Sequence, residues 1–377
     1  MSKLPLVSIV IPVYNGGNYL KEAVDSALNQ TYRNIEILVV NDGSKDDGKT
    51  EAIALSYGDK IRYLKKENGG VASALNMGIR NMKGEYFSWL SHDDLYYPEK
   101  IDMASGSLTT TNFHKYYTLE QITNSVFSVL QLQIHACGAL IHRDNFTRAG
   151  CFDETIYTVQ DIELWFRMLR NRKSCFVPEA LFRVREHAAA GSRTIPSYYA
   201  ETCALYIRLI KKMSLAEMER VFGSPWRFLV RMTAFIKSYG GDISVIEKML
   251  AECSPNDSDN RNRKILAEKL QKNRKRIVIF GAGQYGVRMH YELLKRGIEA
   301  ELFLDNSTEK NQKIIDGLPC QLPETVLDDK DNIMVVVALR NCQSALEQLQ
   351  KLGFTNIIIR QEIDGILTDR SRKQVKV

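Results

Sequence analysis

Two adjacent aspartates, Asp93 and Asp94, cut off an apolar run in the segment "WLSHDDLYYPEKI". Neighbouring carboxylates repel each other, and taking them out of water is costly unless a positive partner lies nearby. Mg²⁺ and Mn²⁺ prefer oxygen ligands, often one or two carboxylates together with the phosphates of a substrate. The pair therefore indicates a divalent-cation site beside a phosphorylated ligand. The alternative is a local role, in which the aspartates cap a helix whose first turn contains Pro98.

The segments around this pair have the order of an open α/β sheet. Apolar runs of strand length, "VSIVIPV", "IEILVV", "IRYL" and "EYFSWL", alternate with helical patterns in "NYLKEAVDSALNQ", "KTEAIALSY" and "GVASALNMGIRN". A polar or glycine-rich segment follows each strand: "YNGG", "NDGS", "KKENGG" and "SHDD". In open α/β sheets ligands bind at this carboxyl edge, where helix starts can receive phosphate. The four turns together predict a nucleotide site.

Three segments carry a resemblance to the family 2 glycosyltransferases with the GT-A fold: "VSIVIPVYNGGNYLKEAVDSALNQTYRNIEILVVNDGS", "ENGGVASALNMGI" and "GEYFSWLSHDDLYYPEKI". The resemblance covers roughly residues 5–195. That family transfers a sugar from a nucleoside diphosphate sugar, most often a UDP-sugar, usually with inversion and with Mn²⁺ or Mg²⁺. The resemblance implies nucleotide-sugar contacts for residues near the strand ends and one later arginine: Pro12, Tyr14, Asn15, Asp42, Asn68, Asp93 and Arg185. Asp42 would accept a hydrogen bond from the base; the alternative is an Asx turn with Gly43.

The metal motif of the family, Asp-x-Asp, is altered in this sequence. Ser91 stands at the first aspartate and His92 at the middle position, so that Asp93 matches the last aspartate and Asp94 follows it. His187 matches a histidine that in many members approaches the metal or the diphosphate. The resemblance thus implies Asp93, Asp94 and His187 as metal ligands.

Further charged groups complete the predicted site. Arg183 and Arg185 alternate in "ALFRVREHAAAGS", so a strand there would turn both to one side, where they neutralise the leaving diphosphate; an edge strand with ordinary surface charge is the alternative. Asp161 begins the helix predicted in "TVQDIELWFRMLRN" and matches the family's general base, which takes the proton of the attacking hydroxyl. Asp161 also suits a helix cap, and both roles can hold together. Glu163 lies on another face and is a poorer candidate.

The second half of the chain reads as a different unit. Residues 216–273 have helical spacing, interrupted by the polar segment "CSPNDSDNRNRK", which predicts a loop or hinge. After it, an apolar strand pattern runs into Gly281-x-Gly283-x-x-Gly286, a helix follows, and a second strand ends on Asp305. This arrangement fits the Rossmann dinucleotide fingerprint. The domain either binds a nucleotide, such as NAD(P) or a sugar nucleotide, or keeps the fold for packing or homo-oligomerisation.

The predicted fold class is α/β. We expect a doubly wound mixed GT-A sheet in residues 1–215, a helical connector in residues 216–273 and a smaller Rossmann-like domain in residues 274–377. A chain of 377 residues exceeds one ordinary core, which agrees with more than one domain. A hydrophobic content of 44% and a charged content of 25% are typical of a soluble globular protein.

The cysteine content, the length of the apolar runs and the net charge predict that the protein is cytoplasmic. No apolar run approaches the length of a bilayer span, and "MSKLPLVSIVIPVY" carries no small-residue cleavage site. Seven cysteines without a C-x-x-C pair argue against a disulfide framework and for a reducing compartment. The net charge of +6 includes the stretches "RNRK", "KNRKR" and "DRSRKQVKV", which fit a solvated surface or peripheral attraction to the inner face of the cell membrane. No nucleic-acid-binding module is recognisable.

Three functional hypotheses are compatible with the sequence. The favoured one is a metal-dependent inverting glycosyltransferase that modifies a saccharide or lipid-linked acceptor in bacterial surface polysaccharide synthesis. The second is a bifunctional enzyme whose carboxyl-terminal domain adds an NAD(P)-dependent step. The third is a non-catalytic sugar-nucleotide-binding protein, because Ser91 replaces one carboxylate of the metal motif.

Overall fold

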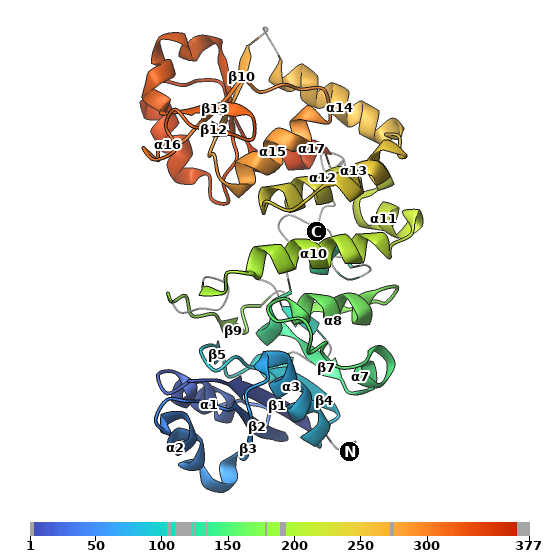
Figure 1. Ribbon diagram of the computed structural model, residues 1–377, viewed down its shortest axis with the longest axis vertical. Helices are drawn as coiled ribbons and strands as arrows, with labels where there is room; N and C mark the ends of the chain where they lie inside the picture. The colour runs from blue at the N-terminus through green and yellow to red at the C-terminus, as the bar shows by residue number, and fades with distance from the viewer. Residues whose placement is uncertain are drawn as a thin grey trace. The chain divides into compact units, whose positions relative to one another are not determined.

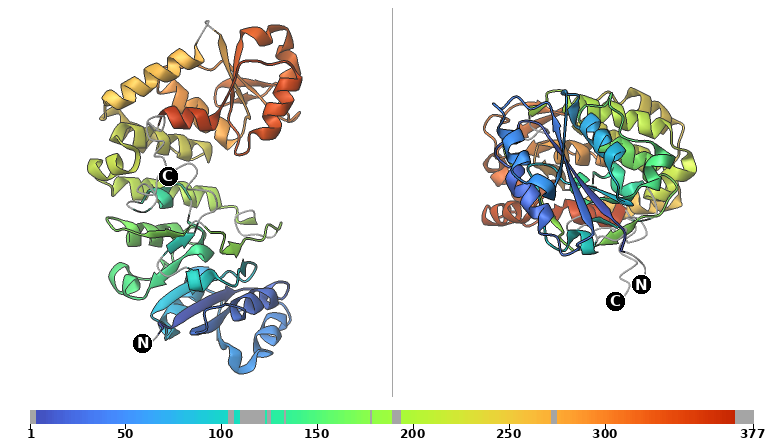
Figure 2. Two further views of the ribbon diagram at one scale, coloured as in Figure 1. Left: turned by 180° about the vertical axis from the view of Figure 1, so that it is seen from behind. Right: turned by 90° about the horizontal axis from the view of Figure 1, so that it is seen from below.

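The computed structural model describes residues 4–103, 107–109, 123, 126–132, 134–177, 179–188, 194–271 and 275–367. The chain divides into two compact units, Met1–Leu205 and Tyr206–Val377, and each contains its own sheet (Figures 1 and 2). The three-part division at residues 215 and 273 stays a prediction. Within the described ranges, no helix combines the length and the apolar character needed to cross a bilayer.

The first unit is built on a five-stranded sheet with the strand order β3-β2-β1-β4-β7. Four strands run parallel and the last is antiparallel: β1 (Val7–Val13), β2 (Ile35–Asp42), β3 (Arg62–Lys66), β4 (Tyr86–Trp89) and β7 (Leu140–His142). β1 lies at the centre and is buried along its whole length, which explains its continuous apolar sequence. The predicted mixed sheet is confirmed.

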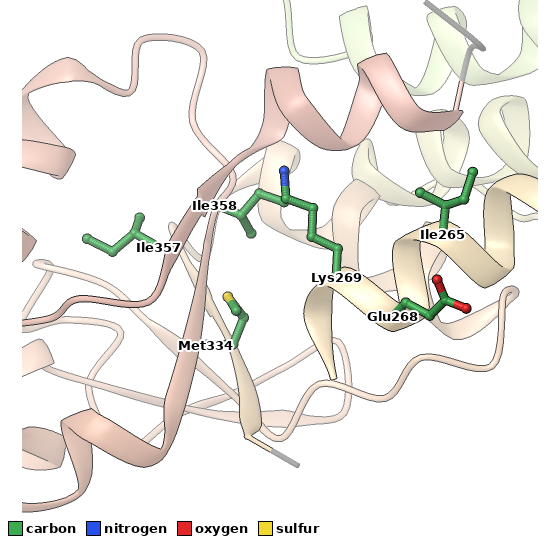
Figure 3. Close-up of a pocket in the computed structure, with 6 residues that line it drawn as sticks. All are labelled: Ile265, Glu268, Lys269, Met334, Ile357 and Ile358. Carbon is green, nitrogen blue, oxygen red and sulfur yellow. The ribbon is translucent and has the colours of Figure 1, made fainter. Parts of the chain in front are cut away.

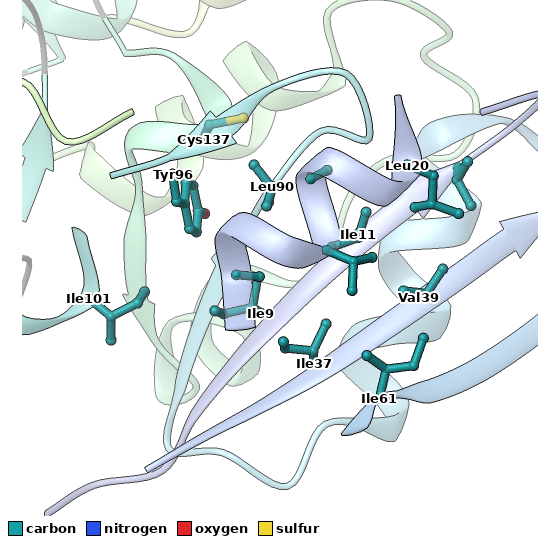
Figure 4. Packing of buried hydrophobic residues seen from close by; sticks show 14 of the residues in the cluster. Ile9, Ile11, Leu20, Ile37, Val39, Ile61, Leu90, Tyr96, Ile101 and Cys137 are labelled. Carbon is teal, nitrogen blue, oxygen red and sulfur yellow. The ribbon is translucent and has the colours of Figure 1, made fainter. Parts of the chain in front are cut away.

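Helices cover both faces of this sheet. The connections between the parallel strands contain α1 (Leu20–Leu28), α2 (Lys49–Leu55), the 3₁₀ helix η1 (Gly58–Lys60) and α3 (Gly70–Asn81). Ile9 and Ile11 of β1 pack in one core cluster with Leu20 of α1 (Figure 4). Val10, between them, faces the other way, and α3 approaches it so closely that a Cβ on Gly78 would lie 2.4 Å from its side chain. The sheet is therefore doubly wound, as the alternating pattern predicts.

The remaining elements of the first unit follow β4 in the chain. A short strand, β5 (Leu95–Tyr96), follows the aspartate pair and pairs antiparallel with β9 (Phe182–Arg183). The other elements are α4 (Lys100–Met103), β6 (Ser107–Thr109) parallel to β8 (Cys175–Val177), α6 (Phe127–Leu130), η3 (Ala136–Gly138), α7 (Asp144–Ala149) and α8 (Gln160–Leu169). Because β5 separates the aspartates from α4, they do not cap that helix, and the local alternative is wrong.

The helical part of the chain after β9 consists of α10 (Tyr198–Lys211), α11 (Leu215–Phe222), α12 (Pro225–Ser238), α13 (Ser244–Ala251) and α14 (Asp257–Leu270). The expected loop at "CSPNDSDNRNRK" is wrong, since most of this segment is the start of α14. Asn256 accepts a hydrogen bond from the backbone N–H of Asp259, and the Asp259 carboxylate accepts one from the backbone N–H of Asn256. This reciprocal cap turns a polar stretch, which resembles a loop in composition, into a helix start.

The second sheet has the strand order β12-β13-β11-β10-β14-β15. Its strands are β10 (Arg276–Phe280), β11 (Leu302–Leu304), β12 (Ile314–Ile315), β13 (Leu318–Gln321), β14 (Ile333–Val337) and β15 (Ile357–Ile359), all parallel except β12. The helical segments are α15 (Gln284–Leu294), η5 (Pro323–Asn332), α16 (Gln343–Lys351) and α17 (Arg360–Leu367). The second, smaller α/β unit is thus confirmed, whereas its assignment as a Rossmann-like nucleotide-binding domain stays a prediction.

Candidate functional site

Asp42, the last residue of β2, joins the turns at the carboxyl edge of the first sheet. Its Oδ1 accepts hydrogen bonds from Lys66 Nζ at 2.7 Å and from the Gly69 backbone N–H at 3.0 Å, and its Oδ2 accepts one from the Gly70 N–H at 2.8 Å. These backbone groups belong to the start of α3, where negative charge is favourable. The Asx-turn alternative fails, because Asn41, not Asp42, accepts the local bond from the Ser44 N–H.

The turns after β1 and β2 are tied together. Asn15 has a left-handed backbone with φ of 52°, its N–H donates to Ser44 Oγ at 2.9 Å, and its Oδ1 accepts from the Lys45 N–H at 2.7 Å. Tyr14, one residue earlier, is 43% exposed at this edge, whereas Pro12 is buried within β1.

The third turn joins the same group, since Asn68 Nδ2 donates to the carbonyl oxygen of Asp42 at 3.0 Å. The structure therefore brings Tyr14, Asn15, Asp42 and Asn68 to one edge of the sheet. An exposed aromatic ring beside amide and carboxylate groups can hold a base and a ribose.

Asp93 meets His187, although they lie 94 residues apart, with Asp93 Oδ2 and His187 Nε2 separated by 2.9 Å. The loop after β9 makes this contact and also places Arg185, whose Nε donates to the carbonyl oxygen of Asp93 at 3.1 Å. The Arg185 guanidinium lies 4.4 Å from the ring centroid of Tyr19 and pairs with Glu22 at 2.7 Å. The carboxylate, imidazole and guanidinium predicted for the diphosphate side of the site therefore converge.

The expectation that Arg183 and Arg185 share one face of a strand is wrong. β9 ends at Arg183, so no strand pleat relates the two residues. Arg183 lies over the ring of Tyr97, 5.5 Å from its centroid, and donates to its hydroxyl at 3.3 Å. Of the two arginines, Arg185 alone contacts the aspartate turn in the described part of the chain.

Asp94 turns inward and is only 4% exposed. Its Oδ1 accepts a hydrogen bond from the Arg185 backbone N–H at 3.0 Å, and its Oδ2 lies 3.2 Å from Cys137 Sγ. Burial raises the pKa of this carboxyl group above its usual value. The bond to Arg185 holds the loop that carries His187, and these inward contacts weigh against Asp94 as a direct ligand of the predicted Mn²⁺ or Mg²⁺.

The side chains of Asp94, His135 and Cys137 form a second group of metal-binding type, with ligand atoms all within 4.8 Å of one another. Burial lowers the pKa of His135, which keeps its imidazole neutral. A thiolate suits zinc, whereas Mn²⁺ and Mg²⁺ favour oxygen. Asp93 with His187 is therefore the better fit to the predicted cation. The sequence around His135 and Cys137 gives no sign that these side chains lie next to Asp94, because the contact depends on tertiary folding.

Asp161 and Glu163 occupy different environments on α8. The cap position is Val159, which makes no side-chain cap bond, and Asp161 is the second residue of the helix. Burial raises the pKa of Asp161 to about 6, although backbone N–H groups of Ile162 and of Asp161 itself partly oppose the shift. Glu163 is held by Arg167, whose Nε lies 2.9 Å from both of its carboxylate oxygens. Asp161 is thus the better proton acceptor of the two.

In the second unit, the glycines differ in what surrounds them. A Cβ on Gly286 would lie 1.9 Å from the carbonyl oxygen of Gly281, whereas Gly283, the residue before α15, has open space around it. Asp305 Oδ2 accepts hydrogen bonds from the Ala282 N–H at 2.7 Å and from Lys310 Nζ at 3.0 Å. Open space at Gly283 is compatible with a phosphate, but Asp305 already occupies one N–H group of the turn.

A hollow in this unit does not coincide with the glycine turn. It has a volume of about 520 Å³, and Figure 3 shows Lys269 and Glu268 of α14 beside Met334, Ile357 and Ile358. Met334 and Ile357 lie at the beginnings of β14 and β15, so this hollow is at the amino ends of the strands. The glycine turn follows the carboxyl end of β10, which runs parallel to them.

Comparisons with known proteins find similar sequences and similar solved structures. Residues 8–112 match the family described as Glycosyl transferase family 2. An uncharacterized glycosyltransferase of Rickettsia typhi is 48% identical over 260 residues, which cover 63% of this chain and 81% of the relative. A second one, of Rickettsia bellii, is 46% identical over 258 residues, or 62% of this chain and 37% of the relative, so the chain spans less than half of that protein.

More distant relatives extend the comparison. The minor teichoic acid biosynthesis protein GgaB of Bacillus subtilis is 30% identical over 217 residues, which cover 50% of this chain and 24% of GgaB. Among solved structures, the mannosyltransferase PcManGT of Pyrobaculum calidifontis, in complex with GDP-Man and Mn²⁺, aligns with a TM-score of 0.49 and 14% identity over 78% of this chain and 88% of that chain.

Proposed function

Because the chain belongs to glycosyl transferase family 2, we propose that it transfers a sugar, with inversion, from a nucleoside diphosphate sugar to a saccharide or lipid-linked acceptor. UDP is the proposed nucleotide. The proposed setting is bacterial surface polysaccharide synthesis, which the relationship to a teichoic acid biosynthesis protein supports. A cytoplasmic location, with peripheral contact to the membrane, is supported by the seven cysteines, none of which is in a disulfide bond in the structure.

The contact between Asp93 and His187 carries this proposal. It brings a carboxylate and an imidazole from two distant segments of the chain to the same point. We assign these two side chains as the protein ligands of Mn²⁺ or Mg²⁺, which when bound neutralises charge on the diphosphate leaving group. Asp94 then positions the loop through the Arg185 N–H.

The nucleotide would lie along the turns of Tyr14, Asn15, Asp42 and Asn68. Lys66 and the start of α3 hold the Asp42 carboxylate in place. The lone pairs that these bonds leave unused therefore point in a defined direction. Asp161 takes the proton of the acceptor hydroxyl; a pKa of about 6 leaves most of the carboxyl groups ionised at neutral pH and still basic enough to accept a proton.

A donor screen tests the proposal. UDP-, GDP-, CMP- and dTDP-sugars are compared by thermal shift with and without Mn²⁺, and the sugar that stabilises the protein is then followed for hydrolysis and transfer. We expect a UDP-sugar to raise Tm in a Mn²⁺-dependent manner. If no donor raises Tm, the nucleotide site is misassigned. If a donor binds but Mn²⁺ never promotes its hydrolysis or transfer, the non-catalytic alternative replaces the enzyme.

A second candidate activity rests on the open space at Gly283. If the second unit binds a nucleotide such as NAD(P) at the start of α15, Gly283→Val abolishes that binding by filling the space needed for the phosphates. Donor binding in the first unit should be unchanged. Turnover of NADH or NADPH by the full chain would establish a bifunctional enzyme, whereas no binding of either dinucleotide removes this candidate.

A further inference from the structure

The hollow beside α14 in the second unit is lined mainly by apolar side chains, several of which keep exposed surface (Figure 3). Met334 is the one residue of β14 that is not fully buried, and Ile357, at the start of β15, is also only half-buried. Ile265 of α14, which borders the hollow, is 43% exposed. Contiguous apolar surface of this kind marks a place where another molecule docks favourably.

Two opposite charges flank Ile265 on the same face of α14. Arg261 and Glu268 are separated by about two helical turns, so they lie within about 20° of each other around the helix, with Ile265 between them along its axis. Both are exposed, and neither forms an ion pair with another residue in the described ranges. Lys269, next to Glu268, is already paired with Glu362 at 2.8 Å. Arg261 and Glu268 are therefore free to pair with groups of a docking partner.

The order of these residues along α14 is complementary to itself in the reverse direction. A twofold axis between residues 264 and 265 places two copies of the helix antiparallel. Arg261 of each copy then faces Glu268 of the other, because both residues are equally far from the axis, and the two Ile265 side chains meet beside it. A parallel pair in register would instead place like charges opposite each other, which is unfavourable.

An ordinary solvated helix face is the alternative, since exposed charges are common and isolated surface pairs contribute little. That alternative does not account for the exposed Ile265 or for the apolar hollow beside it. Lys264 does not oppose the antiparallel arrangement. It lies about 140° around the helix from Lys269, on the flank away from the hollow, so its ammonium group can reach water.

We propose that the occupant of this surface is a second copy of the same chain, in a twofold-symmetric dimer in which α14 packs antiparallel against its copy. The two Ile265 side chains meet at the axis and shield the two hollows from water. Ion pairs between Arg261 and Glu268 form at both ends of the contact. Homo-oligomerisation is one of the roles that the sequence leaves open for this unit, and the dimer does not depend on the proposed sugar transfer.

Sedimentation velocity of the full chain between about 1 and 100 µM tests for the dimer, because a small interface predicts dissociation in roughly the micromolar range. We expect the average mass to rise towards that of two chains as the concentration increases. Ile265→Asp should weaken association about tenfold or more, since it places two carboxylates at the centre of the contact. The matched control is Leu294→Asp, at a position of α15 that is 46% exposed and outside the hollow, and it should change association less than about twofold.

Charge reversal tests the antiparallel pairing. Arg261→Glu and Glu268→Arg should each weaken association several-fold, because each places like charges opposite each other at both ends of the contact. An equimolar mixture of the two single variants should associate more tightly than either variant alone, since the mixed dimer again pairs an acidic with a basic side chain at both ends. The double variant Arg261→Glu/Glu268→Arg should associate like the wild type. Lys248→Glu, at an exposed position of α13, is the control and should have no effect.

Three results would overturn the proposal. The first is a full chain that remains monomeric up to about 100 µM, which would mean that the hollow has another occupant. The second is association that Ile265→Asp leaves unchanged. The third is a mixture of Arg261→Glu and Glu268→Arg that associates no more tightly than the separate variants. Circular dichroism checks that each variant is folded.

Discussion

At the scale of single residues, two carboxylates of α8 differ in their surroundings. Asp161 and Glu163 are two positions apart on α8, but Glu163 has an arginine partner, whereas burial governs Asp161 and raises its pKa to about 6. Composition alone cannot separate them, because the difference arises from the neighbours that folding supplies. The prediction that Asp161 is the better base could be made from the family resemblance. The environment that makes it suitable could not.

The first prediction concerns Asp161→Asn. Transfer should fall by on the order of 10²-fold or more, while donor affinity stays near the wild-type value. Stability at pH 7.5 should rise, by less than about 3 kcal/mol because Asp161 is only partly buried, since the native state no longer holds a carboxylate whose pKa is raised from 3.8 to about 6. This gain should disappear as the pH falls through 6 towards 4, where wild-type Asp161 becomes protonated. The measurements are the transfer rate, the donor affinity and the free energy of unfolding in urea at pH 7.5 and at pH 4.

Two outcomes would contradict the assignment of Asp161. Transfer within a few fold of wild type would reject it as the base. Loss of Mn²⁺-dependent donor binding together with transfer would assign it to the cation instead.

A second prediction separates the two aspartates of the turn. Asp93→Asn should weaken Mn²⁺-dependent donor binding about tenfold or more, and His187→Ala should have a similar effect, because both side chains meet at the same point. Asp94→Asn should affect Mn²⁺ dependence less, since Asp94 faces the Arg185 N–H and Cys137. Donor titrations at several Mn²⁺ concentrations measure this. Equal losses in the two aspartate variants would restore Asp94 as a ligand.

At the scale of elements, one buried lysine connects the strands around the aspartate turn. Lys100, the first residue of α4, has no exposed surface, and its Nζ donates to Ser88 Oγ of β4 at 2.6 Å and to the carbonyl oxygen of Ala139 at 3.1 Å. The ring of Tyr96 in β5 lies 4.7 Å away. Burial lowers the pKa of Lys100 to about 7, and no carboxylate among the described residues pairs with its Nζ.

The third prediction follows from this pKa. The unfolded chain binds more protons at Lys100 than the native state does between about pH 7 and pH 10.5, so stability should rise with pH across this window, by up to about 1.4 kcal/mol per pH unit. Lys100→Met should remove this contribution and flatten the pH dependence. Unfolding in urea at pH 7, 8 and 9 measures it, with the exposed Lys83→Met as control. An unchanged slope in Lys100→Met would show that the lysine stays charged.

Elements with strong periodicity could be predicted almost to the residue. β1 and α3 agree with "VSIVIPV" and "GVASALNMGIRN" because apolar spacing and glycine punctuation indicate the same boundaries. The start of α14 could not be predicted from composition, since its cap consists of the same polar residues as a loop. The strand predicted in "ALFRVREH" is longer than the observed β9. After Arg183 the chain stops pairing with β5 and turns to contact Asp93 and Asp94. In both cases tertiary contacts outweigh local pattern.

At the scale of the whole chain, the fourth prediction concerns independence of the first unit. All side chains assigned to the donor lie before residue 190, within the compact unit Met1–Leu205. A chain of residues 1–215, which retains all of α10, should therefore bind the donor with an affinity within a few fold of the full chain. Thermal shift with the donor found above tests this, and circular dichroism checks folding. Loss of binding by a folded truncated chain would mean that the second unit contributes to the site.

The order in which the chain is synthesised gives the long-range contact of Asp93 a further consequence. Asp42 meets its partners in α3 across 27 and 28 residues, but Asp93 meets His187 across 94. A nascent chain leaving the ribosome therefore completes the turns proposed to bind the nucleotide well before the side chains proposed to bind the cation. Closing the longer loop costs more entropy, by roughly 1 kcal/mol for 94 residues against 28. A chain synthesised only as far as α3 would therefore carry most of the proposed nucleotide turns without the proposed cation ligands.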